Sequence, residues 1–167
     1  MIVISDTSPL NYLILIEQAE RLYDLYGRVV IPQAVFDELL AAETPEKVRA
    51  WLLSKPEWLE VQALAPTSDT ELTYLGAGER EAIALAEQLR ADALLMDDRD
   101  GRREAASRHL RVVGTLAVLV DAAERGLLEL PKAFKRLQQT TFRASPRLFK
   151  TLLEQAQSVR RTGRVGY

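Results

Sequence analysis

Ile2-Val3-Ile4-Ser5-Asp6 opens the chain with a short apolar run that ends in a carboxylate. Ala93-Leu94-Leu95-Met96-Asp97-Asp98 repeats this pattern much later in the chain. A short apolar run bounded by polar residues is typical of a strand that is buried on both faces. Parallel strands deliver their carboxyl ends to one edge of a sheet, where open α/β sheets bind ligands. The two segments therefore predict a parallel sheet with acidic side chains at its ligand-binding edge.

The rest of the first 127 residues alternates between strand and helix patterns. Strands are predicted at 2–5, 29–31, 58–64, 93–96 and 111–113, and prolines on both sides of 58–64 place that strand at an edge of the sheet. Helices are predicted at 9–16, 18–26, 45–53, 79–89 and 101–109. A further helix starts at Pro32, and Thr115 caps another that Gly126 ends. Ser8 is the predicted N-cap of the first helix, with Pro9 at its first position. This alternation predicts an α/β fold whose central parallel sheet is covered on both faces.

The last 40 residues differ from the rest in pattern and in charge. They read as extra C-terminal helices, with starts at Pro131 and Pro146 and with Ser145 as an N-cap, followed by a mobile basic tail over 160–167. Residues 1–127 hold 13 Lys or Arg against 22 Asp or Glu, whereas residues 128–167 hold 9 against 2. We therefore expect a domain at 1–127 and a basic helical extension at 128–167. The extension either attracts a polyanion or folds onto its own acidic body.

Composition narrows the class of protein. The chain of 167 residues is 47% hydrophobic and 28% charged, as in ordinary globular proteins. It has no cysteine, which excludes disulfides and thiolate metal sites. No apolar run approaches the roughly 20 residues that span a bilayer, and no signal peptide is recognisable. The expected compartment is the cytoplasm, without membrane contact.

Carboxylates on different elements are expected to converge at the ligand edge of the sheet. Asp6 and Asp98 follow strands, and Glu38 and Glu79 lie on helices beside them. Crowded carboxylates take up protons unless a cation lies between them, and an all-oxygen set of ligands favours Mg²⁺ or Mn²⁺. Such ions support hydrolysis of phosphodiesters. The alternative is that these residues are helix caps and surface charges of a structural protein.

Four motifs occur together in this order: Ile4-Ser5-Asp6-Thr7-Ser8-Pro9-Leu10, Ile31-Pro32-x-x-Val35-x-x-Glu38-Leu39, Gly78-Glu79-x-Glu81-Ala82-Ile83-Ala84-Leu85-Ala86 and Leu94-Leu95-Met96-Asp97-Asp98-x-x-Gly101-Arg102. This set resembles the PIN-domain nucleases, in particular the VapC-related, toxin-like subset. The resemblance implies a three-layer α/β/α fold and a ribonuclease, a hydrolase that depends on Mg²⁺ or Mn²⁺. It also implies a toxin–antitoxin pair with an antitoxin protein as partner, and a homodimer.

The resemblance also implies roles for single residues. Asp6 matches the first metal-binding aspartate, and Glu38 matches the glutamate of the Pro-x-x-Val-x-x-Glu-Leu helix. Glu79 stands where many members have aspartate, and Glu81 competes with it for this role. Thr7 or Ser8 is expected to hold the orientation of Asp6 by a hydrogen bond.

The acidic run after the fourth strand offers three further candidates. Alternation along a strand puts Asp98 on the face opposite Asp97, which makes Asp98 the better ligand candidate. Asp100 is either a further ligand or a cap of the following helix. The candidate metal ligands are thus Asp6, Glu38, Glu79, Asp97, Asp98 and Asp100. Four of them are also the candidate catalytic residues, namely Asp6, Glu38, Glu79 and Asp98.

Basic residues just past this run are candidates for RNA binding, namely Arg99, Arg102 and Arg103. The competing interpretation is that these arginines, and Arg108 with them, are solvated helix charges paired with Glu104. The single histidine, His109, is interpreted as a surface residue. Gly76-Ala77-Gly78 lacks the Lys-Ser or Lys-Thr of a nucleotide-binding loop and is interpreted as a turn.

Two functions from different classes follow. The first is a metal-dependent endoribonuclease that cuts the RNA backbone. The second is a PIN-like module that binds RNA or protein without cutting. A phosphoaspartate enzyme or receiver-like domain is disfavoured, because Asp6 has no second aspartate beside it and no well-placed lysine.

Overall fold

The computed structural model describes residues 1–66 and 72–163. Internal contacts divide the chain into two compact units, Met1–Thr115 and Leu116–Tyr167. We describe each unit by itself. The boundary expected from sequence at 127–128 stays a prediction.

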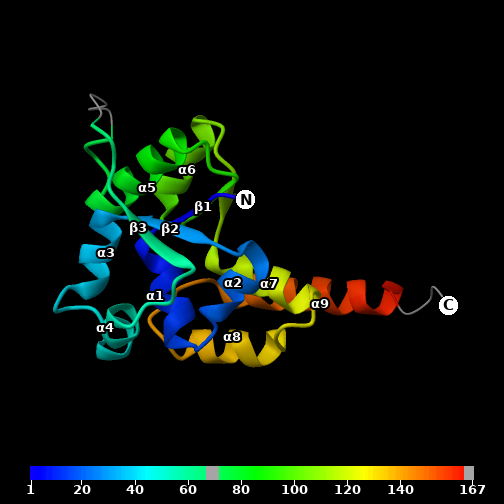
Figure 1. Ribbon diagram of the computed structural model, residues 1–167. Coiled ribbons are helices and arrows are strands. Elements are labelled where there is room, and N and C mark those ends of the chain that lie inside the picture. Colours follow the sequence, from blue (N-terminus) through cyan, green and yellow to red (C-terminus); the bar gives the residue numbers. More distant parts are fainter. Residues whose placement is uncertain (67–71, 164–167) are drawn as a thin grey trace. The chain divides into compact units, whose positions relative to one another are not determined.

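The first unit is built on a five-stranded parallel sheet (Figure 1). In spatial order its strands are β3 (Leu59–Gln62), β2 (Val29–Pro32), β1 (Val3–Ser5), β4 (Ala93–Leu95) and β5 (Val112–Val113). All neighbouring pairs run parallel. Every residue of β1, β2 and β4 is buried, as the apolar runs predicted, and β3 lies at an edge. The predicted α/β fold with a central parallel sheet is therefore confirmed.

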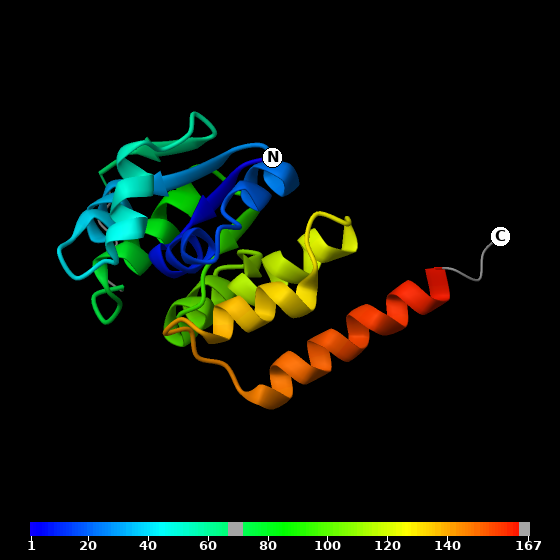
Figure 2. The same cartoon turned by 90° about the horizontal axis from the view of Figure 1, so that it is seen from below.

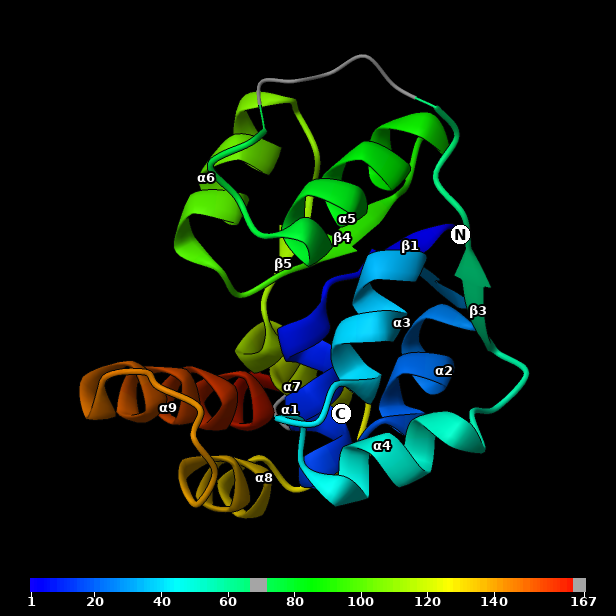
Figure 3. The same ribbon diagram turned by 90° about the vertical axis from the view of Figure 1, so that its left-hand side faces the viewer.

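Helices lie on both faces of this sheet. Figure 3 shows α5 (Ala77–Gln88) and α6 (Arg99–Ser107) on one face and α1 (Thr7–Leu15) on the opposite face. The remaining helices of this unit are α2 (Glu20–Tyr26), α3 (Gln33–Leu40) and α4 (Glu46–Leu53). One core cluster joins strand residues such as Ile4 and Leu94 to Ile83 of α5 and Ala105 of α6. The helical and strand periodicities of the sequence are both satisfied by this burial.

Several helices begin earlier than the sequence predicted. The structure starts α1 at Thr7 with Asp6 at the N-cap position, so the assignment of Ser8 as N-cap was wrong. Pro9 is tolerated in the first turn because an amide there would have no partner within the helix. Similarly, α6 starts at Arg99 because the carboxylate of Asp98 caps it. The acidic residues at strand ends therefore also occupy helix N-termini.

The second unit is helical, apart from its connections. It contains α7 (Thr115–Glu124), which starts at the last residue of the first unit, α8 (Leu130–Gln138) and α9 (Pro146–Gly163). Figure 2 shows α8 and the long α9 in yellow-orange and orange-red. The side-chain oxygen of Ser145 accepts a hydrogen bond from the Leu148 amide at 3.1 Å, which confirms the predicted N-cap. Residues 160–163 belong to α9 rather than to a mobile tail, and the rest of the predicted tail, 164–167, lies outside the described residues.

None of the helices in the described residues is both long enough and apolar enough to cross a membrane.

Candidate metal centre

The candidate site lies at the carboxyl ends of β1 and β4, the two adjacent central strands. The order of the strands reverses here. From β1, the sheet continues through β2 and β3 on one side and through β4 and β5 on the other. Such a switch point is the usual ligand site of an open α/β sheet. The amide of Asp6 donates to the carbonyl of Leu95 at 2.9 Å, which ties the end of β1 to the end of β4. Asp6 and Asp97, separated by 90 residues, are thus held at one edge of the sheet.

Asp6 is the most unusual acid of this edge. It is only 1% exposed, and neither of its carboxylate oxygens has a hydrogen-bond partner among the described residues. Burial, followed by the negative charge of Glu79, raises the pKa of Asp6 to about 8, and Glu38 and Asp97 add to this rise. The nearby Thr7 amide lowers the pKa without reaching hydrogen-bonding geometry. A buried carboxylate without a donor requires either a proton or a cation.

Glu38 is held by two donors from different elements. The Thr7 hydroxyl donates to one carboxylate oxygen at 2.5 Å and the Gly78 amide donates to the other at 2.9 Å. A Cβ at position 78 would lie 2.5 Å from an oxygen of Glu38, so any other residue there requires the end of the Glu38 side chain to shift. Thr7 therefore orients Glu38 rather than Asp6. The half-buried Ser8 side chain makes no hydrogen bond to a described residue.

Glu79 and Glu81 have different surroundings, although they lie on the same helix. The half-buried Glu79 has a raised pKa, because of burial first and then because of Glu38 and Asp98. The carboxylate of Glu81 instead accepts the Ala34 amide at 2.9 Å, in the first turn of α3. Of the two competing residues, Glu79 is the one whose charge raises the pKa of Asp6, and Glu81 holds the amino end of the helix that carries Glu38.

Asp97 and Asp98 lie on different sides of the site. Asp97 accepts the Thr115 amide at 2.8 Å and the Thr115 hydroxyl at 2.6 Å, and its pKa is raised by burial although Thr115 and Arg102 act against the rise. Asp98 is exposed and accepts the Gly101 amide at 2.7 Å as the cap of α6. The charge of Asp97 acts on Asp6 and that of Asp98 acts on Glu79. Both acids therefore border the cluster, Asp97 next to its buried part.

The remaining candidates lie on α6, and of these Arg102 reaches back toward Asp97. Asp100 is exposed in the first turn of α6, and its charge acts on Tyr74. Arg99, Arg102 and Arg103 are exposed as well. Arg102 donates to the Met96 carbonyl at 3.1 Å, and its guanidinium lies so close to Gly114 that a Cβ there would be 2.6 Å away. The exposed His109 agrees with its interpretation as a surface residue.

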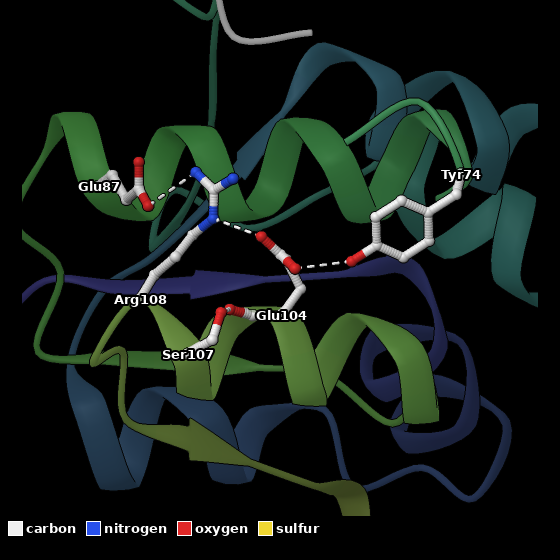
Figure 4. Close-up of polar contacts among 5 residues, drawn as sticks. All are labelled: Tyr74, Glu87, Glu104, Ser107 and Arg108. Carbon is white, nitrogen blue, oxygen red and sulfur yellow. Dashed lines mark hydrogen bonds and ion pairs between the residues drawn. The ribbon is translucent and has the colours of Figure 1, made fainter. Parts of the chain in front are cut away.

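A polar network fixes α5 against α6 (Figure 4). Arg108 donates to Glu104 at 2.9 Å and to Glu87 at 3.0 Å, and the Tyr74 hydroxyl donates to the other oxygen of Glu104 at 2.7 Å. The predicted pairing of Arg108 with Glu104 is thus present. The network joins the helix that carries Glu79 to the helix that Asp98 caps.

The chemistry of these groups fits a hard divalent cation, although the side chains do not form a finished metal site. Among the described residues, no group of three or more His, Cys, Asp or Glu is close enough to hold an ion. The two free oxygens of Asp6 are nevertheless the donors that such an ion takes. Glu38 and Asp97 are bonded to protein donors, but each carboxylate oxygen retains a second lone pair.

Sequence reasoning missed two residues of this site. Gly78 was interpreted as part of a turn and Thr115 as a helix start, whereas their backbone amides bind Glu38 and Asp97. A signal was present in both motifs, because Gly78 directly precedes Glu79 and Gly114 precedes Thr115. Glycine beside a polar residue at a helix start often marks a close backbone approach.

Comparison with known proteins gives three findings. The structure resembles a PilT N-terminus domain protein from the hyperthermophilic archaeon Sulfolobus solfataricus P2, with a TM-score of 0.55 and 18% identity over 73% of this chain and 93% of that chain. No curated protein matches the sequence. The family model described as "DUF3368: PIN domain" matches residues 2–158. An α/β sheet with acids at its switch point and a family match over nearly the whole sequence lead to one conclusion: the chain belongs to the PIN-domain family.

Proposed function

We propose that the protein is a divalent-metal-dependent endoribonuclease that hydrolyses RNA phosphodiester bonds. Proteins of the PIN-domain family are generally nucleases. The observation that carries the proposal is the buried carboxylate of Asp6, whose two oxygens have no donor among the described residues and whose pKa is raised to about 8 by burial and by neighbouring acids. Such a group fits an Mg²⁺ or Mn²⁺ ligand better than a structural cap.

The proposal gives each acid a role that follows from its contacts. Asp6 and Glu79 would hold the cation directly, while Glu38 and Asp97 would contribute their remaining lone pairs. Asp98 would act from the exposed rim. The chemistry that a divalent cation supplies in such sites is activation of water and neutralisation of phosphate charge.

The exposed arginines supply the second half of the proposed site. Arg99, Arg102 and Arg103 lie in the first turns of α6, beside the acids. Guanidinium groups bind phosphate through paired hydrogen bonds. They would offset the repulsion between the acids and an RNA backbone.

Cleavage of a mixed RNA pool by the purified chain tests the proposal. Cutting should require Mg²⁺ or Mn²⁺, stop with EDTA and disappear in Asp6→Asn, which keeps the shape of the side chain. Asp37→Asn is the matched control, because Asp37 is exposed on α3 and contacts Gln33. Cleavage by Asp6→Asn at the wild-type rate would refute the assignment.

A second function, a PIN-like module that binds RNA or protein without cutting, has its own support. The described residues contain no finished metal group, and the carboxylates of Glu38, Asp97 and Asp98 already accept hydrogen bonds from the protein. Titration calorimetry separates the two functions. Binding of Mn²⁺ that is lost in Asp6→Asn favours the enzyme, and absence of binding favours the module.

The VapC-like features are proposed on the sequence motifs alone. We propose a cytoplasmic toxin of a toxin–antitoxin pair, held by an antitoxin protein and assembled as a homodimer. Expression in a bacterial host should then stop growth with the wild-type chain but not with Asp6→Asn. Light scattering should give about twice the 18.8 kDa of one chain; a monomer mass would contradict the homodimer.

A further inference from the structure

The hairpin formed by α8 and α9 carries an unusual concentration of positive charge. Residues 130–163, which span both helices and their connection, contain eight Lys or Arg and a single acid, Glu154. By contrast, the first unit, residues 1–115, holds 12 Lys or Arg against 20 Asp or Glu. The positive charge is therefore a local property of the hairpin and not of the whole chain.

The helices of the hairpin hold these cations on a defined scaffold. Phe134 of α8 and Phe149 of α9 are both buried and meet edge to face, with ring centroids 5.1 Å apart. Phe142 of the connecting segment also meets Phe149 edge to face, with ring centroids 6.5 Å apart. Aromatic pairs of this kind stabilise a packed contact beyond the burial of their area. These aromatic contacts join α8 to α9, and the basic residues of the hairpin are exposed.

The basic residues are exposed, and most have no internal partner. We call Lys135, Arg143, Arg147 and Lys150 the hairpin cations. All four are exposed, and none forms a hydrogen bond or ion pair through its side chain with another described residue. Lys132 differs, because it pairs with Glu129 at 2.7 Å.

Their spacing suits an extended polyanion. Arg147 and Lys150 are three residues apart on α9, and Lys135 lies in the last turn of α8, just before the connection that carries Arg143. Residues three apart lie on the same face of a helix, so Arg147 and Lys150 form neighbouring charges. Because these cations form no ion pair with another described residue, phosphate binding breaks no existing pair, although it does order each side chain.

We propose that the hairpin cations form a binding surface for the RNA backbone, separate in sequence from the catalytic acids. The choice of RNA as the polyanion rests on the proposed function. A carboxylate-rich first unit repels RNA, and a concentrated cationic surface on the same chain supplies the attraction that the first unit lacks. The surface contacts phosphates and therefore gives affinity without sequence preference.

Binding is measured with the full-length Asp6→Asn chain in EDTA, so that cleavage cannot interfere. Fluorescence anisotropy of a labelled single-stranded RNA of about 20 nucleotides is followed between about 50 and 300 mM KCl. Each phosphate contact with a single strand contributes about −0.7 to the slope of log K against log salt. Replacing all four hairpin cations by Gln should reduce the magnitude of the slope by about 3 and weaken binding at low salt by at least about 10-fold.

A matched variant controls for total charge. It replaces Arg28, Lys47, Arg90 and Arg111 of the first unit by Gln; these four are exposed and their loss changes the net charge by the same amount. This variant should bind RNA within about twofold of the parent chain. Circular dichroism and gel filtration establish that both variants are folded.

The outcomes separate this inference from the proposed function. Equal weakening in both variants, or in neither, overturns the assignment of the hairpin. Equally tight binding of poly-glutamate, a polyanion without phosphates, would assign the surface to an acidic protein segment and also overturns it. If the wild-type chain binds RNA through the hairpin but never cleaves it, the inference is supported and the proposed nuclease function is refuted. Cleavage that proceeds unchanged after loss of the hairpin cations supports the nuclease and overturns the inference.

Discussion

Asp6 and Glu38 solve the problem of negative charge at the sheet edge in opposite ways. Glu38 receives a hydroxyl and an amide, from Thr7 and Gly78, so its charge is stabilised by the protein itself. Asp6 receives no hydrogen bond from the described residues, and only the nearby Thr7 amide offsets part of its charge. A carboxylate with protein donors is fixed in place, whereas one without them is available to a cation.

Gly78→Ala tests whether the position of Glu38 matters to the site. The new Cβ would lie 2.5 Å from one oxygen of Glu38 and 2.9 Å from the other, so Glu38 must move. A displacement of about 1 Å in an active site costs roughly 100-fold in rate. We expect cleavage to fall by about that factor while the fold survives, since alanine is otherwise favoured in a helix.

Gly163→Ala at the end of α9 is the control substitution for this variant. It makes the same chemical change far along the chain from the acids and should leave the cleavage rate unaltered. Full activity in Gly78→Ala would show that the contact between Glu38 and the Gly78 amide has no catalytic importance.

At the level of elements, the site depends on how α5 and α6 are held together. Arg108 projects from the end of α6 between Glu104 of its own helix and Glu87 of α5. Its side chain is only 16% exposed, so these pairs are screened less than surface pairs. Exposed ion pairs contribute little, but a largely buried arginine with two acidic partners contributes more.

Arg108→Met removes the cation but keeps much of the apolar stem. The free energy of unfolding, measured by urea denaturation, should fall by about 1–2 kcal/mol because two acids lose their shared donor. Arg103→Met on the exposed side of the same helix is the control and should change it by less than about 0.5 kcal/mol. Equal effects of the two substitutions would show that the network of Figure 4 does not stabilise the packing of α5 on α6.

Strands and helix ends could be predicted from the sequence to different degrees. The strands were predictable because β1, β2 and β4 are short apolar runs. The end of α2 was predictable from Gly27, a glycine that takes a positive φ of 75° in the structure. Helix starts were less predictable, because Asp6 and Asp98 serve both the sheet edge and the helix N-termini. Local patterns cannot distinguish these two uses of one carboxylate.

The sequence named candidate acids for the site but not the donors that hold them. Asp6, Glu38 and Glu79 were identified from their places after strands and on helices, and the structure brings their charges together. The amides of Gly78 and Thr115 were missed, since their bonds join residues 40 and 18 positions apart. Such hydrogen bonds depend on how the elements pack, which a local sequence pattern does not show.

For the molecule as a whole, the uncompensated acids predict an unusual dependence of stability on pH. Burial raises the pKa of Asp6 from 3.8 to about 8, and it also raises the pKa values of Glu79 and Asp97. Between pH 3.8 and about pH 8 the folded chain keeps a proton on Asp6 that the unfolded chain has released. Stability falls with rising pH wherever the folded state binds more protons, so Asp6 lowers the stability of the metal-free protein as the pH rises from about 4 to about 8.

Asp6→Asn removes this titration, and its effect on folding should therefore change with pH. In EDTA at pH 8 the free energy of unfolding of the variant should exceed that of the wild type by at least about 1 kcal/mol, because one unit of pKa shift corresponds to about 1.4 kcal/mol. Near pH 4 the free energies of unfolding of the two proteins should agree more closely. Urea denaturation at both pH values measures the difference, with Asp37→Asn as an exposed control. Adding Mn²⁺ at pH 8 should stabilise the wild type but not Asp6→Asn, since a ligand that binds only the folded state raises its stability. A wild type that is as stable as Asp6→Asn at pH 8 in EDTA would mean that the Asp6 carboxylate is already compensated within the fold, and the argument for a cation at this position would then fail.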